Sequence, residues 1–182
     1  MVTNMQRSDS RPLVRALIGA VLLVGCSLAA DGQPRTPPTG PSTGTLVVAG
    51  DVDKTLTLTP EQLKALPRTS VTIEEDGRPV KYEGVLIGEL LKMAGAPVGG
   101  NMRGNAVSSY VLATGNDGYS ALFSIAELDP AFTRSQIIVA DSADGKPLFD
   151  YQGPFRIIAP QDTRAARSVR MLEKIELVRV KK

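Results

Sequence analysis

The chain has 182 residues, of which 42% are hydrophobic and 22% are charged, so it can form one domain with a substantial core. It contains no histidine, no tryptophan and a single cysteine, Cys26. These absences exclude a Ser-His-Asp or Cys-His catalytic site, a histidine-containing zinc site and a disulfide within the chain. The formal net charge of +2 is too small to indicate nucleic-acid binding.

The first thirty residues have the pattern of an export signal. Arg7, Arg11 and Arg15 precede an apolar run at residues 16–24, which is too short to span a bilayer stably. The run ends in the tetrapeptide Leu-Val-Gly-Cys at Cys26, which resembles the bacterial lipobox. We therefore expect cleavage before Cys26 and attachment of lipid to this residue.

An ordinary signal peptide that is cut before Ala30 is the alternative interpretation. With a lipid anchor, the protein is expected on the periplasmic face of a bacterial membrane. Ser27 after the cysteine, in place of aspartate, favours the outer membrane. The next segment is rich in proline, glycine and hydroxyl residues and lacks large apolar side chains, so it is predicted to be a tether. The predicted organisation is a signal peptide at 1–25, the lipid-attachment cysteine and tether at 26–44, and one domain at 45–182.

The first half of the domain is predicted to contain short strands and two short helices. The sequence Thr-Pro-Glu-Gln at 59–62 has the form of a capping box, with Pro60 at the first helical position. A second helix is predicted over 84–94, with Gly95 as its C-cap. Its expected buried face consists of Leu86, Leu90, Met93 and Ala94. The expected elements in chain order are a strand at 46–49, a helix from 60 to 66, strands at 70–73 and 79–82, and the helix at 84–94.

The second half is predicted to be mostly strand. The turn sequence Asn-Asp-Gly at 116–118 lies between two β-rich runs and predicts a hairpin. The expected elements are strands at 110–113 and 119–123, a short helix at 125–128, a strand at 136–140 that is buried on both faces, a strand at 155–159 and an edge strand at 175–180. The fold class is therefore α+β, with a mixed, mostly antiparallel sheet and short helices.

Several short phrases of this sequence fall in a familiar order. They are Gly-Val-Leu at 84–86, Asn-Asp-Gly-Tyr at 116–119, Glu-Leu-Asp at 127–129, Asp-Gly-Lys-Pro-Leu at 144–148, Gly-Pro-Phe-Arg at 153–156 and Arg-Ser-Val-Arg at 167–170. In this order and spacing, residues 45–180 resemble the oxidoreductase molybdopterin-binding domain, the fold of sulfite oxidase and its bacterial relatives. The resemblance implies that molybdopterin is the cofactor to consider.

The sequence departs from the family pattern at the metal. In that family a cysteine thiolate binds molybdenum, a metal for which a soft anionic sulfur is a suitable ligand. Here the one cysteine, Cys26, precedes the domain, and no histidine is present. The leader arginines are also never adjacent, so we expect export unfolded by the general route rather than by the twin-arginine route. Both features predict a domain without molybdenum and with no catalytic or metal-binding residues.

The candidate binding residues are basic and aromatic. Arg164, Arg167 and Arg170 recur every third residue, which would place them on one helical face. The resemblance implies that basic residues in this part hold the pterin phosphate, so Arg164 and Arg167 are candidate ligands for an anion. Arg156 and Tyr119 are further candidates. A solvated face for the arginines, a tight turn before Arg156 and a simple hairpin tip at Tyr119 are the alternative interpretations.

Two groups of carboxylates receive a structural interpretation only. Glu74, Glu75 and Asp76 are predicted to form a solvated turn, since they lack the spaced oxygen ligands of a calcium loop. The same interpretation applies to the second group, which consists of Asp141, Asp144 and Asp150.

Three functions stay open from the sequence, because a fold does not determine a function. The first is an exported, lipid-anchored module without molybdenum that binds an anionic small molecule or a protein of the cell envelope. The second is a molybdopterin-dependent oxidoreductase of the periplasm. The third is a structural envelope lipoprotein.

Overall fold

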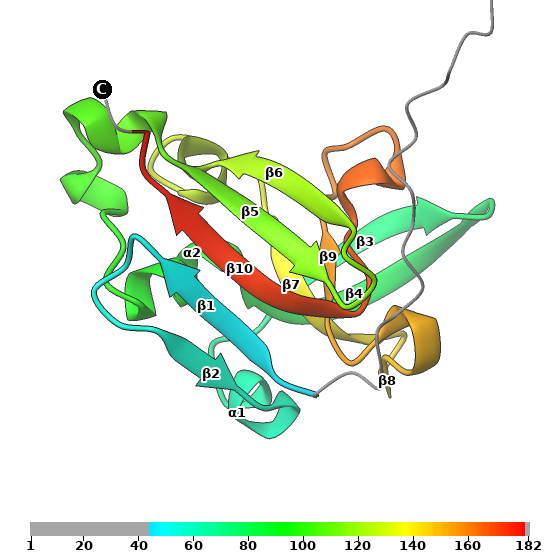
Figure 1. The fold of residues 1–182 in the computed structure, drawn as a ribbon. Helices are drawn as coiled ribbons and strands as arrows, with labels where there is room; N and C mark the ends of the chain where they lie inside the picture. The colour runs from blue at the N-terminus through cyan, green and yellow to red at the C-terminus, as the bar shows by residue number, and fades with distance from the viewer. Residues whose placement is uncertain (1–43, 181–182) are drawn as a thin grey trace, which may run out of the picture. The chain divides into compact units, whose positions relative to one another are not determined.

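The computed structural model describes residues 44–180, which form two five-stranded sheets with short helices between the strands (Figure 1). The predicted signal peptide, Cys26 and all but the last residue of the predicted tether lie outside the described residues. The α and β elements in chain order are β1 (Leu46–Gly50), β2 (Leu56–Leu58), α1 (Pro60–Lys64), β3 (Thr69–Glu75), β4 (Arg78–Leu86), α2 (Ile87–Met93), β5 (Tyr110–Gly115), β6 (Ser120–Ser124), β7 (Ile138–Ala143), β8 (Lys146–Pro147), β9 (Arg156–Ile158) and β10 (Leu172–Val178). No helix within this part of the chain is long and apolar enough to cross a membrane.

The two sheets have different strand orders. Sheet A has the order β2-β1-β10-β5-β6, and sheet B has the order β3-β4-β7-β8, with β9 also paired to β7. Of these pairs only β1 with β10 is parallel. The described fold is therefore mixed and mostly antiparallel, as predicted.

The main core lies between the sheets. It joins fully buried residues of sheet A to fully buried residues of sheet B, with α2 contributing from one side. Typical members are Val48, Val111 and Ile175 from sheet A and Val85, Val139 and Ile157 from sheet B. Residues 138–141 of β7 are all buried, which confirms the prediction of a strand covered on both faces. The first three of these residues are apolar, as expected where neither face meets water, and the fourth, Asp141, forms an ion pair with Arg68.

The start of α1 follows the predicted capping box. The Thr59 hydroxyl accepts a hydrogen bond from the Gln62 amide, and the Gln62 side chain accepts one from the Thr59 amide. Pro60 occupies the first turn, where its missing N–H costs nothing. Leu63 is fully buried, so a five-residue helix is anchored to the core through one side chain.

The second predicted helix begins three residues later than expected. Residues 84–86 are the end of β4 and pair with β7, so α2 begins at Ile87. A side chain at Gly84 would lie 2.0 Å from the Val139 carbonyl oxygen, so glycine permits this close strand contact. The helix buries Leu90 and Leu91, whereas Met93 of the expected face is 37% exposed. The pattern of apolar residues was assigned to one helix because the strand and the helix follow each other without a turn.

The terminal strand was wrongly predicted to be an edge. β10 lies in the middle of sheet A, parallel to β1 on one side and antiparallel to β5 on the other (Figure 1). Leu172, Ile175 and Leu177 are buried by 99% or more. Composition identified the strand, but its two neighbours come from distant parts of the chain, and no local signal specifies them.

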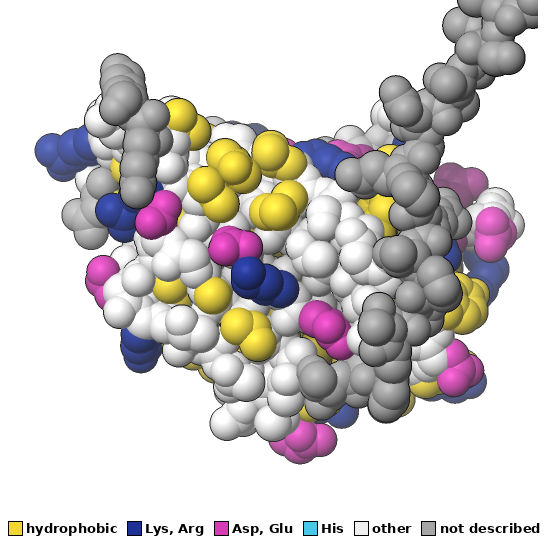
Figure 2. All heavy atoms as spheres, viewed as in Figure 1, with side chains coloured by type: hydrophobic (Ala, Val, Ile, Leu, Met, Phe, Trp, Pro, Cys, Tyr) yellow, Lys and Arg dark blue, Asp and Glu magenta, His cyan; other side chains and the backbone are white. Residues whose placement is uncertain are grey.

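The outer face of sheet A carries mixed side chains. Leu122 of β6 is 53% exposed and stands opposite Leu112 of β5, and Figure 2 shows hydrophobic side chains gathered on this face. Lys174 and Glu176 of β10 form an ion pair there, with 2.7 Å between Nζ and Oε2. One face of sheet A thus contributes to the core and the other is partly exposed, as is common for antiparallel sheets.

Candidate functional site

The candidate site is built around Arg156, the first residue of β9. Its side chain is fully buried, although the strand that carries it is otherwise apolar. The backbone explains its position, because β9 pairs with β7 on one side and Ile157 donates its amide to the Val169 carbonyl on the other. The chain bends at Pro154, directly after the 3₁₀ helix Asp150–Gln152, and the strand that follows is fully buried, in line with the predicted turn before a buried strand.

Four side chains form a hydrogen-bonded network at the Arg156 guanidinium. Nη1 donates to the Tyr82 hydroxyl and to Gln152 Oε1, each at 2.7 Å, and Nη2 donates to Glu75 Oε1 at 2.5 Å. The Tyr82 hydroxyl donates to Glu75 Oε2 at 2.8 Å. Among the described residues, the buried Nε of Arg156 has no hydrogen-bond partner. We call Arg156, Glu75, Tyr82 and Gln152 the Arg156 network.

The Arg156 network keeps its charge state over a wide pH range. Burial and the hydrogen bond to Glu75 raise the pKa of Tyr82 to about 12. Burial acts to raise the pKa of Glu75, but hydrogen bonds from Arg156 and Tyr82 outweigh it, and the pKa lies below its usual value. At neutral pH the network therefore contains one guanidinium, one carboxylate and one neutral phenol.

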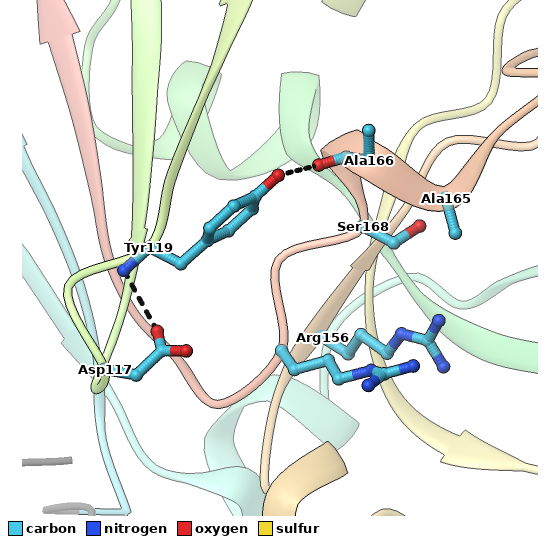
Figure 3. Close-up of a pocket in the computed structure, with 7 residues that line it drawn as sticks. Asp117, Tyr119, Arg156, Ala165, Ala166 and Ser168 are labelled. Atoms are coloured by element: carbon cyan, nitrogen blue, oxygen red, sulfur yellow. Dashed lines mark hydrogen bonds between the residues drawn. The ribbon is translucent and has the colours of Figure 1, made fainter. Parts of the chain in front are cut away.

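A cavity of about 240 Å³ borders this network (Figure 3). Two arginines line it, Arg156 from β9 and Arg170 from the segment before β10. Asp117 and Tyr119 line it from the hairpin between β5 and β6. The remaining lining residues come from the segment around the 3₁₀ helix η5 (Ala165–Arg167), namely Ala165, Ala166 and Ser168. We call this space the arginine cavity.

Local hydrogen bonds fix the hairpin side of the arginine cavity. The Tyr119 amide donates to Asp117 Oδ1 at 3.0 Å, which is an Asx turn at the predicted hairpin tip. The Tyr119 hydroxyl donates to the Ala166 carbonyl, so the ring connects the hairpin to η5. The Arg170 guanidinium lies 5.3 Å from the centre of the Tyr151 ring. The cavity is thus framed by the hairpin, the start of β9 and the segment from η5 to Arg170.

The predicted arginine helix does not form. Only residues 165–167 are helical, as one 3₁₀ turn, and Arg170 lies beyond it. Arg167 is instead held between two carboxylates, with Nη2 at 2.6 Å from Asp162 Oδ1 and Nη1 at 3.0 Å from Glu127 Oε2. Its guanidinium also lies 4.7 Å from the centre of the Phe123 ring, and the hydrogen bonds to Asp162 and Glu127 raise its pKa.

The four predicted binding residues thus have different positions. Arg156 and Tyr119 line the arginine cavity. Arg164 and Arg167 do not line it: Arg164 is an exposed residue that precedes η5, and Arg167 belongs to the Asp162–Glu127 pair. The binding roles of all four residues stay predictions.

Two carboxylates that were expected in solvated turns are partly or fully buried. Glu75 lies at the end of β3 and belongs to the Arg156 network, while the turn itself is made by Asp76 and Gly77. Asp141 is 3% exposed and accepts two hydrogen bonds of 2.7 Å from Arg68. Both errors have the same cause, because the arginine partner of each carboxylate is more than 70 residues away in sequence.

The Arg156 network also borders a second cavity, of about 430 Å³. Glu75, Tyr82 and Gln152 line this space together with the exposed aromatic residues Phe149 and Tyr151. Members of the network therefore line two cavities. Glu75, Tyr82 and Gln152 were not predicted as site residues. An otherwise apolar strand that begins with arginine was the available signal that buried polar partners are needed.

The described residues offer few ligands for a metal. The only cysteine of the chain is Cys26, outside the described part, and the chain has no histidine. Within residues 44–180 no group of three or more acidic residues that could hold a metal ion is present. The arginine cavity thus presents guanidinium, hydroxyl and carboxylate groups, and its chemistry is that of hydrogen bonding and charge.

Comparison with known proteins supports the fold and identifies the family. No curated protein matches the chain. The crystal structure of the sulfane dehydrogenase SoxCD from Paracoccus pantotrophus is similar, with a TM-score of 0.59 and 21% sequence identity over 75% of this chain. The match covers 38% of the SoxCD chain, and at this identity it shows a shared fold alone. The family model for the oxidoreductase molybdopterin-binding domain matches residues 77–182. The chain therefore belongs to the oxidoreductase molybdopterin-binding domain family, and its fold is sulfite-oxidase-like.

Proposed function

We propose that this domain is a binding module for a small anionic molecule and that it functions without molybdenum. The observation that carries the proposal is the Arg156 guanidinium, which is fully buried beside the arginine cavity with its Nε unpaired among the described residues. A buried donor without a partner costs about 1–3 kcal/mol, and because this Nε is closed off from solvent, an oxyanion from the cavity would reach it after a small movement of the surrounding side chains.

Arg170 supplies the second positive charge. Glu75 balances the charge of Arg156, whereas Arg170 makes no ion pair within the described part of the chain and contacts the Tyr151 ring. Guanidinium groups bind carboxylates, sulfonates and phosphates through paired hydrogen bonds. Ser168 adds a hydroxyl to the same wall. These donors come from two segments and line one space, which favours a bound oxyanion over a purely structural role.

Molybdopterin is the group that the family typically binds. The described residues do not fit its metal, because they include no thiolate and no imidazole. The cavity volume of about 240 Å³ is also below the roughly 300–1,000 Å³ of sites for drug-sized ligands. A smaller anion without metal fits the donors and the space better.

Ligand-dependent stability tests this function in the full chain. Phosphate, sulfate and acetate are compared with chloride at equal ionic strength, and thermal unfolding is followed by circular dichroism because the chain lacks tryptophan. An anion at ten times its Kd stabilises the folded state by about 1.4 kcal/mol, or several degrees in Tm. Stabilisation should disappear in Arg170→Gln and persist in Arg164→Gln, which changes an arginine outside the cavity. If phosphate, sulfate and acetate all fail to raise the Tm above its value in chloride, the proposal is contradicted.

The second candidate function is a molybdopterin-dependent oxidoreductase, which family membership favours. Two measurements distinguish the oxidoreductase from the anion-binding module. They are elemental analysis for molybdenum and tungsten, and a pterin fluorescence assay, both on protein purified from its own envelope. Near-stoichiometric metal and pterin would replace the first proposal by the second. A structural lipoprotein without ligand would show neither cofactor nor stabilisation by anions.

We also propose that the protein is exported and anchored by lipid on Cys26, at the periplasmic face of a bacterial membrane. The support is the apolar run that ends in Leu-Val-Gly-Cys and the tether that follows. The variant Cys26→Ala should move the protein from the membrane fraction to the soluble fraction. Unchanged membrane association would contradict the anchor.

A further inference from the structure

We propose that the second cavity of this domain binds residues 34–43 of the predicted tether, as an extended segment that packs on Phe149 and Tyr151. These residues of the tether lie outside the described part of the chain. The cavity is lined by the two aromatic residues and, among others, by Tyr82 and Leu148, and we call it the aromatic cavity. The inference is independent of the proposed function, which concerns the arginine cavity.

The two aromatic residues are unusual for a surface. Phe149 is 71% exposed and Tyr151 is 60% exposed, the highest values for large hydrophobic residues in the described part of the chain. They stand on either side of Asp150, at the start of the 3₁₀ helix η4 (Asp150–Gln152), which follows β8 (Figure 1). Single exposed hydrophobic residues are common, but exposed aromatic residues that gather at a cavity are typical of an interaction site.

The composition of the tether suits such a surface. Residues 34–43 read Pro-Arg-Thr-Pro-Pro-Thr-Gly-Pro-Ser-Thr. Pro34 and Pro37 have the spacing Pro-x-x-Pro, which places both rings on one side of a polyproline II helix with three residues per turn. Grooves lined by aromatic side chains bind segments of this kind, because the extended backbone loses little conformational entropy on binding.

Charge provides a second point of complementarity. Asp150, between the two rings, is exposed and makes no ion pair within the described part of the chain. Arg35 is the only charged residue of the segment 34–43. The basic residues of the cavity, Arg78 and Lys146, begin β4 and β8 and are not part of η4. A segment whose prolines contact the rings can therefore pair Arg35 with Asp150.

The described chain also begins at the correct end of the domain. Val47 of β1 lies opposite Lys174 of β10 in a parallel pair, so both strands start at the same end of sheet A. Arg170 lies two residues before β10, and its guanidinium is 5.3 Å from the centre of the Tyr151 ring. The segment 34–43 spans about 30 Å in the polyproline II conformation, so it can extend from the start of β1 towards the rings without a further linker.

Trypsin cleavage after Arg35 tests this contact in the full chain. Arg35 is the only basic residue between Arg15 and Lys54, so the product that begins at Thr36, measured by mass spectrometry, reports on one bond. A synthetic peptide of residues 31–44 gives the cleavage rate of the unbound sequence. The bond should be cut about tenfold or more slowly in the protein than in the peptide, because only the undocked segment enters the protease. Equal rates would contradict the proposal.

Variants of the cavity assign the protection to the two rings. Phe149→Ala combined with Tyr151→Ala should bring the rate in the protein to within about twofold of the peptide rate. Both side chains are exposed, so the domain should stay folded, which circular dichroism checks. Phe132→Ala removes an aromatic residue that is 51% exposed outside the aromatic cavity, and should leave the protection intact. Asp150→Asn should speed cleavage by about threefold, and asparagine tolerates the positive φ of this position.

The remaining outcomes would overturn the proposal in different ways. Protection that survives the loss of both rings means that the tether binds elsewhere, and the assignment to the aromatic cavity is wrong. Protection that disappears on dilution of the protein means that the tether of a second copy occupies the cavity, and the contact within one chain is wrong. Stabilisation by anions is measured separately, so failure of this inference leaves the proposed function in place.

Discussion

Arg156 and Arg167 are both ion-paired arginines that were expected at one binding site, and the structure places them in opposite environments. Arg156 is fully buried, and its partners Glu75 and Tyr82 come from the first half of the domain. The Arg167 side chain is 33% exposed and pairs with Asp162 and Glu127 near the surface. Only Arg156 borders the arginine cavity.

The difference shows that the burial of an arginine side chain, rather than its residue type, determines how much the loss of an ion-pair partner costs. A buried guanidinium must keep every partner, because an uncompensated charge in the interior is costly. A surface guanidinium loses little when a partner is removed, because water replaces it. The donor without a partner among the described residues is Nε of the buried Arg156. Arg156 is therefore a better candidate than Arg167 for binding a ligand, although it is the less accessible of the two.

The largest expected effect is on stability, from Arg156→Met. This change leaves Glu75 as an unpaired carboxylate and removes a partner of Tyr82, which should lower the free energy of unfolding by about 3–5 kcal/mol. Urea unfolding followed by circular dichroism measures the loss.

The double variant Arg156→Met with Glu75→Leu serves as its control. Removing both charges should recover part of the stability, because no unpaired charge is left, while Tyr82 and Gln152 still lose a hydrogen-bond partner. If Arg156→Met alone costs less than about 1 kcal/mol, the contrast between the buried and the surface arginine is wrong.

A second expected effect concerns acid stability. The folded pKa of Glu75 lies below its unfolded value of 4.5, so its ion pair stabilises the protein above that pH and the stabilisation is lost as pH falls through the folded pKa. Glu75→Gln should therefore be less stable than wild type at pH 7, and the difference should narrow below about pH 4.5. Glu74→Gln, the exposed neighbour, should match wild type in unfolding experiments at both pH values. A Glu75→Gln difference that stays constant with pH would contradict the ion pair.

A third and smaller effect concerns alkaline pH. The pKa of Tyr82 is raised to about 12 from 10, so the folded state keeps the phenol proton that the unfolded chain loses. Stability should be unaffected below pH 10 and should fall as pH rises from about 10 to 12. Tyr82→Phe should cost about 1 kcal/mol at pH 7 and show a flatter alkaline profile. Spectrophotometric titration of the tyrosines checks the same point, since one of them should ionise late.

The smallest effect is expected for the surface arginine. Arg167→Gln should lower the free energy of unfolding by about 1 kcal/mol or less, because its ion pairs are partly exposed and screened. The loss should shrink further in 1 M salt. Arg164→Gln is the matched control and should leave stability unchanged in both salt conditions. A loss for Arg167→Gln as large as that for Arg156→Met would remove the distinction between the two sites.

Local features of the fold were predictable from the sequence because they depend on neighbouring residues. The capping box at Thr59, the hairpin at residues 116–118 and the buried strand β7 are confirmed. Each is determined by turn chemistry or hydrophobic pattern within about ten residues. The strand at 84–86 was mistaken for helix because β4 and α2 share one apolar run.

The candidate site was only partly predictable. Arg156 and Tyr119 were named from short phrases, and both line the arginine cavity. Glu75 and Asp141 were missed because each is buried by an arginine from a distant element, and pairing of that kind leaves no trace in local composition. Spacing of arginines predicted a helix that is absent, since the segment after β9 turns in a single 3₁₀ helix instead.

The central position of β10 has a consequence for how the chain acquires its fold. During synthesis β1 has only the three-residue β2 as a partner in sheet A, and a two-stranded ribbon of that length is marginal in water. The contact between Val47 and Lys174 joins opposite ends of the domain, so the contact order is high and folding should be slow. Sheet A can close only after Val178 has left the ribosome, so β1 and β5 stay without their shared central partner until β10 has been synthesised.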